Sequence, residues 1–336
     1  MKCLFLGGNG NISWYVVNEA LKHGHDVWTL NRHQSYRTRR DTLPAVHQVY
    51  ADIHNLSLDV LNLLRREEFD VVFDFICFND FDAQERCRIF GGYIKEYVFI
   101  SSESVYKRSC YNLPFKEDCE QYNPMDVDSY IAGKILAEQS FIKYYENSQF
   151  PVTIIRPTLT YDTIIPLCIG HNCFTASKKL IDGRPVLIGG DGENLLSITH
   201  SKDFANALIN LVESCSIAGE DFHIASEVLI TWNEASKCLF DALEIENYRA
   251  VHIPYKEALK INDFHSPVLM QQRLWHNIYN LSKLKKYVPE WKAEIRYAQG
   301  IKETINWMHA DTVRMRIVEK YSTALDRLYD KYDGRE

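Results

Sequence analysis

The 336-residue sequence lacks several features that would each assign it to a particular class of protein. No apolar run approaches the roughly 20 residues that a membrane-spanning helix needs, so no membrane partner is expected. The nine cysteines form no Cys-x-x-Cys pair and no cluster with histidine at zinc-binding spacing, so no metal site is expected. No secretory leader opens the sequence, and the odd cysteine number favours a reducing compartment. We therefore expect a cytoplasmic protein.

Basic charge is also scarce. Lysine and arginine total 38 against 45 acidic residues, which gives a formal net charge of −7. Non-specific binding to nucleic acid needs a basic face, and the basic cluster at Arg37, Arg39 and Arg40 is short. No nucleic-acid partner is therefore expected. A hydrophobic content of 46% over this length predicts a large core, with one dominant domain and a smaller unit.

The first half of the chain alternates short apolar runs with amphipathic stretches, which is typical of a parallel sheet wrapped by helices. After about Pro157 the strands become shorter and the loops longer. We predict an α/β fold: a Rossmann-type, doubly wound parallel sheet over residues 1–160, to which segments near 203–225 return. Residues 161–336 are expected to form mainly a smaller, substrate-binding α/β domain and C-terminal helices, among them 298–308 and a charged helix over about 312–332.

A glycine-rich turn lies between the first predicted strand and the first predicted helix, in the run Gly7-Gly8-Asn9-Gly10-Asn11-Ile12-Ser13. Gly7 permits a tight turn, and Gly10 lets the backbone approach a pyrophosphate. The following helix start offers unpaired N–H groups and the positive end of its dipole. Ser13 stands where glycine is more usual. A glycine turn without a ligand is the alternative, but the flanking strand and helix favour a dinucleotide bound by Gly7, Gly10, Asn11 and Ile12.

The end of the second predicted strand bears on the choice of cofactor. NAD-selective sites usually place an acidic residue there, whereas this chain has Asn31-Arg32. An arginine can pair with a 2′-phosphate and stack on adenine, so we expect NADP in preference to NAD. Arg32 as a plain surface residue is the alternative. Asp52 and Ile53 would suit the adenine, one through its carboxylate and the other through its apolar side chain.

Tyr130 and Lys134 are four residues apart on a predicted helix and therefore share a face. A tyrosine normally titrates near 10, and a neighbouring lysine cation would move its pKa toward neutrality. Ser101 and Ser102, at the end of the preceding strand, can supply a hydroxyl to the same substrate oxygen. With 20 tyrosines in the chain a chance pair on the surface is the alternative, and the order of the motifs argues against it.

Together these motifs resemble the extended short-chain dehydrogenases/reductases, the superfamily that contains the NAD-dependent epimerase/dehydratase family. The matching segments are the glycine loop, Asp52-Ile53, residues 99–106, Tyr130 with Lys134, Arg156-Pro157-Thr158, His200 with Asp203, residues 280–283 and residues 300–307. The resemblance covers most of the chain. It implies that Ser102, Tyr130 and Lys134 are the catalytic residues, with Tyr130 as the acid/base. It also implies cofactor contacts at Phe75, Tyr130, Lys134 and Pro157.

The resemblance leaves the reaction open. Sugar dehydratases carry an acidic residue where this chain has Ser104, so a dehydratase would have to use Glu103 or another carboxylate. The 4-epimerases place a small hydroxyl residue there, which fits better. An NAD(P)-dependent epimerase or a reductase, acting by hydride transfer on a nucleotide sugar or related polyol, is therefore favoured. A non-catalytic, dinucleotide-sensing protein on the same fold is a further alternative.

Substrate contacts are expected at Ser102, Glu103, Ser104 and His200. Many sugar epimerases bind the diphosphate with an arginine four residues before the aligned histidine, where this chain has Leu196. Either the diphosphate is recognised by Lys178, Lys179, Arg184 or Arg273, or the substrate lacks a diphosphate. His200 and Asp203 could instead have a packing or capping role at a helix start. The resemblance also implies a homodimer formed by helices around 82–91 and 129–145, whose outer faces are predicted to contain Phe141, Tyr144 and Tyr145.

Overall fold

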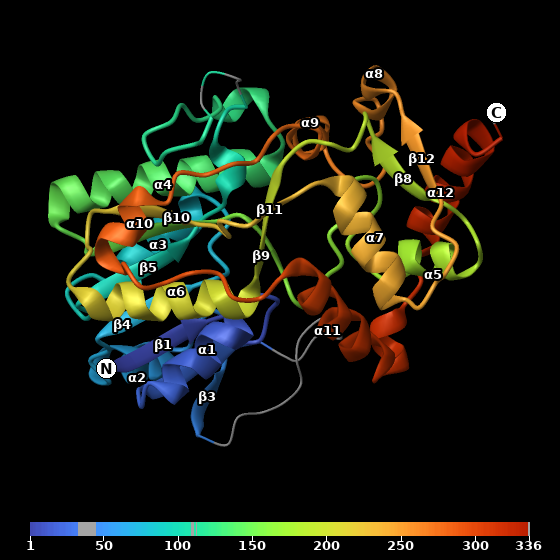
Figure 1. Ribbon diagram of the computed structural model, residues 1–336. Coiled ribbons are helices and arrows are strands. Elements are labelled where there is room, and N and C mark those ends of the chain that lie inside the picture. The colour runs from blue at the N-terminus through green and yellow to red at the C-terminus, as the bar shows by residue number, and fades with distance from the viewer. Residues whose placement is uncertain (33–44, 109–110, 112, 335–336) are drawn as a thin grey trace.

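The computed structural model describes residues 1–32, 45–108, 111 and 113–334, so Arg37, Arg39 and Arg40 lie outside the described residues. A seven-stranded sheet dominates one half of the molecule, with the order β10-β6-β5-β4-β1-β2-β3 and every pairing parallel (Figure 1). Its strands are β1 (Lys2–Leu6), β2 (Asp26–Asn31), β3 (Val46–Tyr50), β4 (Val71–Asp74), β5 (Glu96–Ile100), β6 (Val152–Pro157) and β10 (Asp221–Ile224). The strand order reverses between β1 and β4, which is where open α/β sheets bind ligands. The predicted α/β class and Rossmann-type sheet are confirmed.

Helices cover both faces of this sheet, which explains why its strands are apolar at consecutive positions. Cys3 and Phe5 of β1 pack with α1 (Ser13–Lys22) and α6 (Ser201–Ser214). Leu4 and Leu6 point to the opposite face, which is covered by helices α2 (Leu58–Arg66), α3 (Asp80–Phe90) and α4 (Ser129–Ser148). The carboxyl ends of the strands therefore meet at one edge, between two helical layers.

The other half of the molecule is built around smaller sheets (Figure 1). Its strands are β7 (Leu159–Tyr161), β9 (Leu196–His200) and β11 (Leu229–Ile230) in one sheet, and β8 (Val186–Gly189) and β12 (Ala250–Ile253) in the other. The helices are α5 (Thr175–Ile181), α7 (Trp232–Ala242), α8 (Tyr255–Ala258), α9 (Pro267–Arg273), α11 (Tyr297–His309) and α12 (Glu319–Tyr332). They enclose a core of their own that contains Tyr161 and Trp232.

The chain crosses between the two halves more than once. After β7 it forms the second half, returns through α6 and β10 to the large sheet, and leaves again at β11. It comes back once more with α10 (Ser282–Tyr287), which packs against α6 and β10, and Leu284 and Trp291 lie in the core beside the large sheet. This last return was not predicted, and the domain boundary near residue 160 stays a prediction.

The C-terminal region differs from the single charged helix predicted over 312–332. A short 3-10 turn at Thr312–Met315 is followed by extended residues, and α12 begins only at Glu319. The Val318 N–H donates to the Thr175 hydroxyl (3.0 Å), which holds the chain extended just before the helix. One face of α12 is buried through Leu325, Leu328 and Tyr329, so the helix is part of the core and not a solvated arm.

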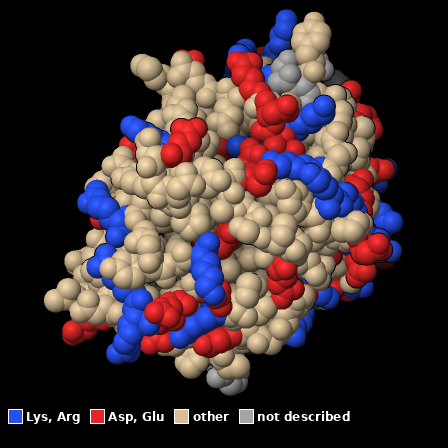
Figure 2. Space-filling view, turned by 90° about the vertical axis from the view of Figure 1, so that its left-hand side faces the viewer, with Lys and Arg blue, Asp and Glu red and all other residues tan. Residues whose placement is uncertain are grey.

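Lysine, arginine and acidic side chains are interspersed on the face of the molecule that Figure 2 shows. Among the described residues no helix is both long enough and apolar enough to cross a membrane. The same part of the chain contains no group of histidine, cysteine and carboxylate side chains arranged to hold a metal ion.

Candidate active site

The predicted phosphate loop is closed by its own serine. Gly7 has a φ of +83°, and a Cβ there would lie 2.6 Å from a methyl group of Ile76. The Ser13 hydroxyl accepts a hydrogen bond from the Gly10 N–H (2.8 Å) and donates one to the Gly7 carbonyl (2.6 Å). The serine that replaces the usual glycine therefore stabilises the turn between β1 and α1.

The start of α1 fits a dinucleotide pyrophosphate. No side chain caps the helix, and its first turn has no acidic residue. The Asn11 side chain is engaged elsewhere: its amide donates to the Thr160 carbonyl (2.9 Å) and its oxygen accepts from the Thr163 N–H (2.9 Å). Asn11 thus joins the loop to the segment that follows β7, which leaves the main chain as the part of this residue that faces a phosphate.

A cavity of about 400 Å³ lies at the carboxyl edge of the large sheet, next to this loop. It brings together residues that the sequence predicted separately for the cofactor, the chemistry and the substrate. These are Gly7, Gly10, Asn11, Ile12, Phe75, Ser102, Glu103, Ser104, Tyr130, Lys134 and Pro157. The volume is in the range of small-molecule sites, and the combination of an uncapped helix start with a glycine turn suits a nicotinamide dinucleotide.

Tyr130 lies in the first turn of α4, where the Asp128 carboxylate caps the helix by accepting from the N–H groups of Tyr130 (3.0 Å) and Ile131 (3.2 Å). Ser102 is the second residue after β5, so both side chains reach the same edge of the sheet. Loss of hydration raises the pKa of Tyr130 above 10, although part of its ring is exposed. The negative charge of Glu103 raises this pKa further, whereas a hydrogen bond with Ser102 lowers it. Tyr130 is therefore protonated at neutral pH in this structure.

Lys134 lies one helical turn after Tyr130 and is almost fully buried. Its ammonium group donates to the carbonyls of Cys77 and Ile100, both at 2.7 Å, and burial lowers its pKa to about 8. We had expected Lys134 to lower the pKa of Tyr130. The structure differs, because the ammonium is held by two backbone carbonyls and burial dominates at the tyrosine.

The lowered pKa of Lys134 predicts a pH-dependent stability. Between its folded value of about 8 and the ordinary value of 10.5, the unfolded chain binds a proton that the folded chain does not. The free energy of unfolding therefore gains about 1.4 kcal/mol per pH unit from this group as the pH rises from 8 to 10. Chemical unfolding of the wild type and of Lys134→Met across that range should show that the free energy of unfolding of the wild type rises with pH relative to that of the variant.

Lys143→Met is the matched control, since Lys143 is an exposed lysine on the same helix. The difference between this variant and the wild type should stay constant with pH. A constant difference for Lys134→Met as well would show that Lys134 titrates as an ordinary lysine.

The predicted adenosine contacts lie apart from the cavity. Arg32 is exposed and Asp52 is half-buried, and a guanidinium nitrogen of Arg32 lies 3.9 Å from the Asp52 carboxylate. Asn31, the last residue of β2, also lies at this edge. Ile53 is only 2% exposed and packs in the core with Leu30 and others, so its side chain offers little surface for an adenine ring. The expectation for Ile53 is therefore corrected, because core packing accounts for its apolar side chain.

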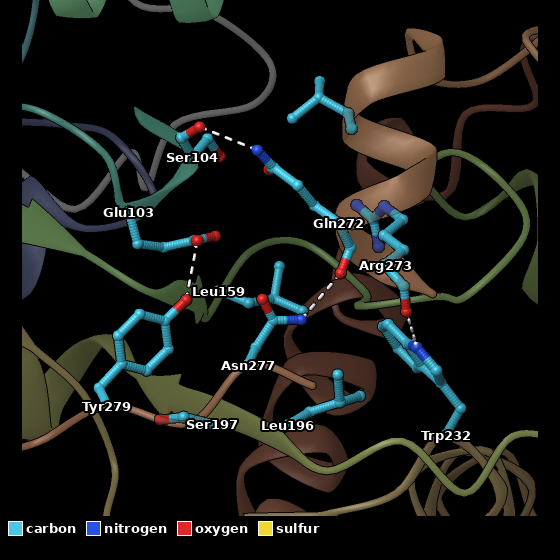
Figure 3. Close-up of a pocket in the computed structure, with 11 residues that line it drawn as sticks. Glu103, Ser104, Leu159, Leu196, Ser197, Trp232, Gln272, Arg273, Asn277 and Tyr279 are labelled. Atoms are coloured by element: carbon cyan, nitrogen blue, oxygen red, sulfur yellow. Dashed lines mark hydrogen bonds between the residues drawn. The ribbon is translucent and has the colours of Figure 1, made fainter. Parts of the chain in front are cut away.

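A second, smaller pocket of about 90 Å³ adjoins the first and shares Glu103, Ser104 and Leu159 with it (Figure 3). The Tyr279 hydroxyl donates to the Glu103 carboxylate (2.8 Å), and the buried Arg108 pairs with the same oxygen. This carboxylate is thus held by two donors, which does not suit a dehydratase base that must remove a proton.

Sequence reasoning did not single out most residues of this small pocket. Those residues are Leu159, Ser197, Trp232, Leu269, Gln272, Asn277 and Tyr279. They come from β7, β9, α7, α9 and the segment after α9, and each is far in sequence from Glu103. Gln272 shows how they converge, because its amide donates to the Ser104 carbonyl (2.8 Å) across 168 residues. No local pattern in the sequence encodes such a contact.

Two substrate predictions need correction. His200 is buried and lines neither of these two cavities. A nitrogen of its ring accepts a hydrogen bond from the Lys202 N–H (3.2 Å) at the start of α6. The ring packs between those of Tyr15 and Tyr161. His200 therefore has the alternative role, that of capping the start of α6. Three of the cations proposed for a diphosphate pair with acidic residues outside both pockets: Lys178, Lys179 and Arg184. The fourth, Arg273, lines the small pocket.

The predicted outer face of α4 also changes. Phe141 is fully buried in the core, and Tyr144 and Tyr145 are partly buried against the same core. The exposed apolar residues of α3 and α4 are instead Phe81, Leu136 and Ile142. Phe141 lies on the face of α4 that packs against the sheet. Because aromatic residues occur on several sides of this helix, the sequence alone did not show which of them face the core.

Residues 81–225 match the model of the NAD dependent epimerase/dehydratase family. The chloroplast stem-loop binding protein of 41 kDa b from Arabidopsis thaliana is 26% identical over 318 residues, which cover 91% of this chain and 78% of that protein. Human dTDP-D-glucose 4,6-dehydratase is 22% identical over 240 residues, covering 68% of this chain and 60% of that protein.

Solved structures of low sequence identity share the fold. UDP-glucuronic acid 4-epimerase from Bacillus cereus in complex with NAD superposes with a TM-score of 0.73 at 16% identity, over 92% of this chain and 99% of that one. The dTDP-glucose 4,6-dehydratase from Bacillus anthracis in complex with NAD gives 0.70 at 20% identity, over 93% and 97%. The solved structures share the Rossmann-type fold of the chain, and the family model shows that residues 81–225 are similar to the NAD dependent epimerase/dehydratase family.

Proposed function

We propose that this protein binds a nicotinamide dinucleotide and uses it for hydride transfer on a sugar nucleotide, as an epimerase or a reductase. One observation carries the proposal: a single cavity is lined by the phosphate loop at one end and by Ser102, Tyr130 and Lys134 at the other. The dinucleotide supplies the hydride acceptor and donor when it is bound. The rest of the chemistry belongs to the chain's own side chains.

Tyr130 is the proposed acid/base. Its hydroxyl, paired with Ser102, donates a proton to a substrate carbonyl oxygen during reduction and takes one from the alcohol during oxidation. Since burial raises the pKa of Tyr130, the protonated form needed for reduction is the resting one. The positive charge of an oxidised nicotinamide ring beside the hydroxyl would lower the pKa of the phenol and permit the reverse step.

Arg273 is the proposed partner of the substrate diphosphate. It lines the small pocket, as does Leu196, at the position where the resemblance to sugar epimerases implies an arginine. Burial lowers the pKa of Arg273 to about 10, so its guanidinium remains charged at neutral pH. Two of the solved relatives are described as complexes with UDP-glucuronic acid and with UDP-N-acetylmuramic acid, which supports a nucleotide sugar as the substrate class.

An epimerase or reductase is favoured over a dehydratase. Ser104 offers a hydroxyl and not a carboxylate, and the Glu103 carboxylate is held by Arg108 and Tyr279. Rapid mixing of protein, NADP⁺ or NAD⁺, and a panel of UDP- and dTDP-hexoses tests this, with absorbance at 340 nm reporting hydride transfer. The proposal expects a burst of reduced cofactor with at least one hexose. Loss of water from the sugar with hydrogen exchange beside the keto carbon would instead identify a dehydratase.

We propose NADP as the preferred cofactor, because Arg32 is exposed at the end of β2 and Asn31 brings no acidic group there. Arg32→Ala should weaken NADP⁺ binding about tenfold, as expected for loss of a charge-assisted hydrogen bond, and leave NAD⁺ binding unchanged. Calorimetric titration of both dinucleotides measures this. Arg88→Ala, which removes an exposed arginine from α3, is the control. Equal weakening of both dinucleotides by Arg32→Ala would remove the basis for NADP preference.

The Arabidopsis relative, named as a stem-loop binding protein, makes RNA a second candidate ligand. The charges are interspersed on the face that Figure 2 shows, and the net charge is −7. Both observations count against RNA as the ligand, since tight binding of RNA needs clustered cations. Submicromolar, salt-sensitive binding of a stem-loop RNA, retained in a Tyr130→Phe variant, would favour that function over catalysis.

We also propose a homodimer formed through α3 and α4, which expose Phe81, Leu136 and Ile142. These apolar side chains lie on two helices that pack against each other, as an interface between copies requires. Sedimentation at micromolar concentration should show a dimer, and a monomer would exclude it. A cytoplasmic location is proposed as well, because the described cysteines are all free.

A further inference from the structure

We infer that the small pocket beside the catalytic residues selects a nucleotide sugar with an uncharged hexose and discriminates against hexuronic acids. The inference rests on the proposed function, since it takes a sugar nucleotide as the substrate. It depends on the distribution of hydrogen-bond acceptors and charges in the pocket that Figure 3 shows.

The end of the pocket next to the catalytic residues carries a carboxylate. Glu103 follows Ser102 directly, and its side chain extends toward the pocket above Tyr279 (Figure 3). One carboxylate oxygen accepts from the Tyr279 hydroxyl (2.8 Å) and pairs with Arg108. These two donors fix the position of the carboxylate, and among the described residues no hydrogen bond is made to its other oxygen. Arg108 itself is buried behind Glu103 over the Phe115 ring and does not line the pocket.

A second acceptor comes from Asn277. Its amide nitrogen donates to the carbonyls of Gln272 (2.9 Å) and Trp275 (3.0 Å), which fixes the orientation of the side chain. The amide oxygen is buried and accepts no hydrogen bond from any described residue. Because a buried acceptor without a donor is unfavourable, this oxygen favours a ligand that brings a hydroxyl or amide hydrogen.

The cation of the pocket lies at its other end. The Arg273 guanidinium approaches the pocket from α9, close to Trp232, whereas Glu103 enters from the opposite side (Figure 3). A sugar nucleotide can satisfy both ends in only one direction, with its diphosphate toward Arg273 and its hexose toward Glu103 and Asn277. The hexose then meets two acceptors.

A hexuronate would place a carboxylate among these acceptors. It has no hydrogen to donate, and its charge is repelled by Glu103 in surroundings that water screens poorly. The cation that neutralises Glu103 is not available to it, because Arg108 lies outside the pocket lining. A hydroxymethyl group at the same position donates a hydrogen bond and carries no charge.

The experiment compares UDP-glucose with UDP-glucuronic acid, which differ only at the sixth carbon, by calorimetric titration of the full-length protein saturated with NADP⁺. UDP-glucose is expected to bind about tenfold more tightly or better. UDP-glucuronamide, which is uncharged and brings N–H donors, is expected to bind like UDP-glucose. If it binds as weakly as the acid, size decides and the inference is wrong.

Tighter or equal binding of UDP-glucuronic acid overturns the inference and leaves the proposed function intact. Binding of none of the three nucleotide sugars contradicts the proposed function itself. Glu103→Gln should bring the affinity ratio of UDP-glucose to UDP-glucuronic acid toward one. Glu120→Gln, which changes an exposed glutamate paired with Lys107, should leave the ratio unchanged. The ligand series on the wild type decides the question even if Glu103→Gln does not fold.

Discussion

Tyr130→Phe is expected to lower kcat/KM by about 10²–10⁴-fold, the usual contribution of a positioned acid/base, while dinucleotide affinity stays at the wild-type value. The substitution removes one hydroxyl and keeps the ring, and the Asp128 cap that begins α4 uses only main-chain N–H groups at this point. Stability should therefore hardly change. The measurement is steady-state turnover of the nucleotide sugar that the protein accepts, together with titration of NADP⁺.

Tyr255→Phe provides the matched control, because Tyr255 and Tyr130 are both 40% exposed and Tyr255 lies outside both pockets. It should retain wild-type turnover. Turnover within about threefold of wild type for Tyr130→Phe would exclude the tyrosine as the acid/base, since even the lower end of such a contribution is about 10²-fold. The cofactor could then still bind, but the chemistry would need another group.

Arg156→Met should lower the free energy of unfolding by about 3–5 kcal/mol, the range for breaking a buried ion pair from one side. Arg156, in β6, is 3% exposed and donates to both oxygens of the buried Glu138 (2.9 and 2.7 Å). It also donates to Asp221 (2.8 Å), so it joins α4 to β6 and β10. Methionine fills much of the same volume but leaves the Glu138 carboxylate buried without its cation. Urea unfolding measures the loss.

Lys283→Met is the control for this prediction. Lys283 pairs with Asp221 (2.8 Å) and Glu220 (3.0 Å) at a half-exposed site, where such pairs contribute about 0–1 kcal/mol. A loss below about 1 kcal/mol in Arg156→Met would mean that the network around Glu138 compensates. That network also receives the Ser101 hydroxyl, next to Ser102, so it helps to hold the end of β5 at the active site.

Local patterns carried most of what the sequence could predict. The glycine loop and its helix, and the spacing of Tyr130 and Lys134, lie within single elements or turns, so their geometry follows from neighbouring residues. The parallel sheet follows from alternating apolar runs and helices. Because parallel strands end at a common edge, the proximity of Ser102 to the loop also followed from topology.

Contacts between distant segments were beyond that reasoning. Tyr279 reaches Glu103 across 176 residues, and Asn11 reaches Thr163 across 152. No pattern in the sequence around Tyr279 or Asn11 indicates which residue it contacts. Ile53 and Phe141 were assigned to a ligand and to an interface because apolar residues serve equally well in a core, and only the packing distinguishes these roles.

The central claim is that one cavity holds a nicotinamide dinucleotide between the phosphate loop and Tyr130. A crystal structure of the protein with NADP⁺ tests it most directly. The account predicts the pyrophosphate against the main chain of residues 10–13 at the start of α1, and the nicotinamide ring beside Tyr130 and Pro157 in the 400 Å³ cavity. Dinucleotide bound elsewhere, or a cavity left empty at saturating NADP⁺ and NAD⁺, would contradict it.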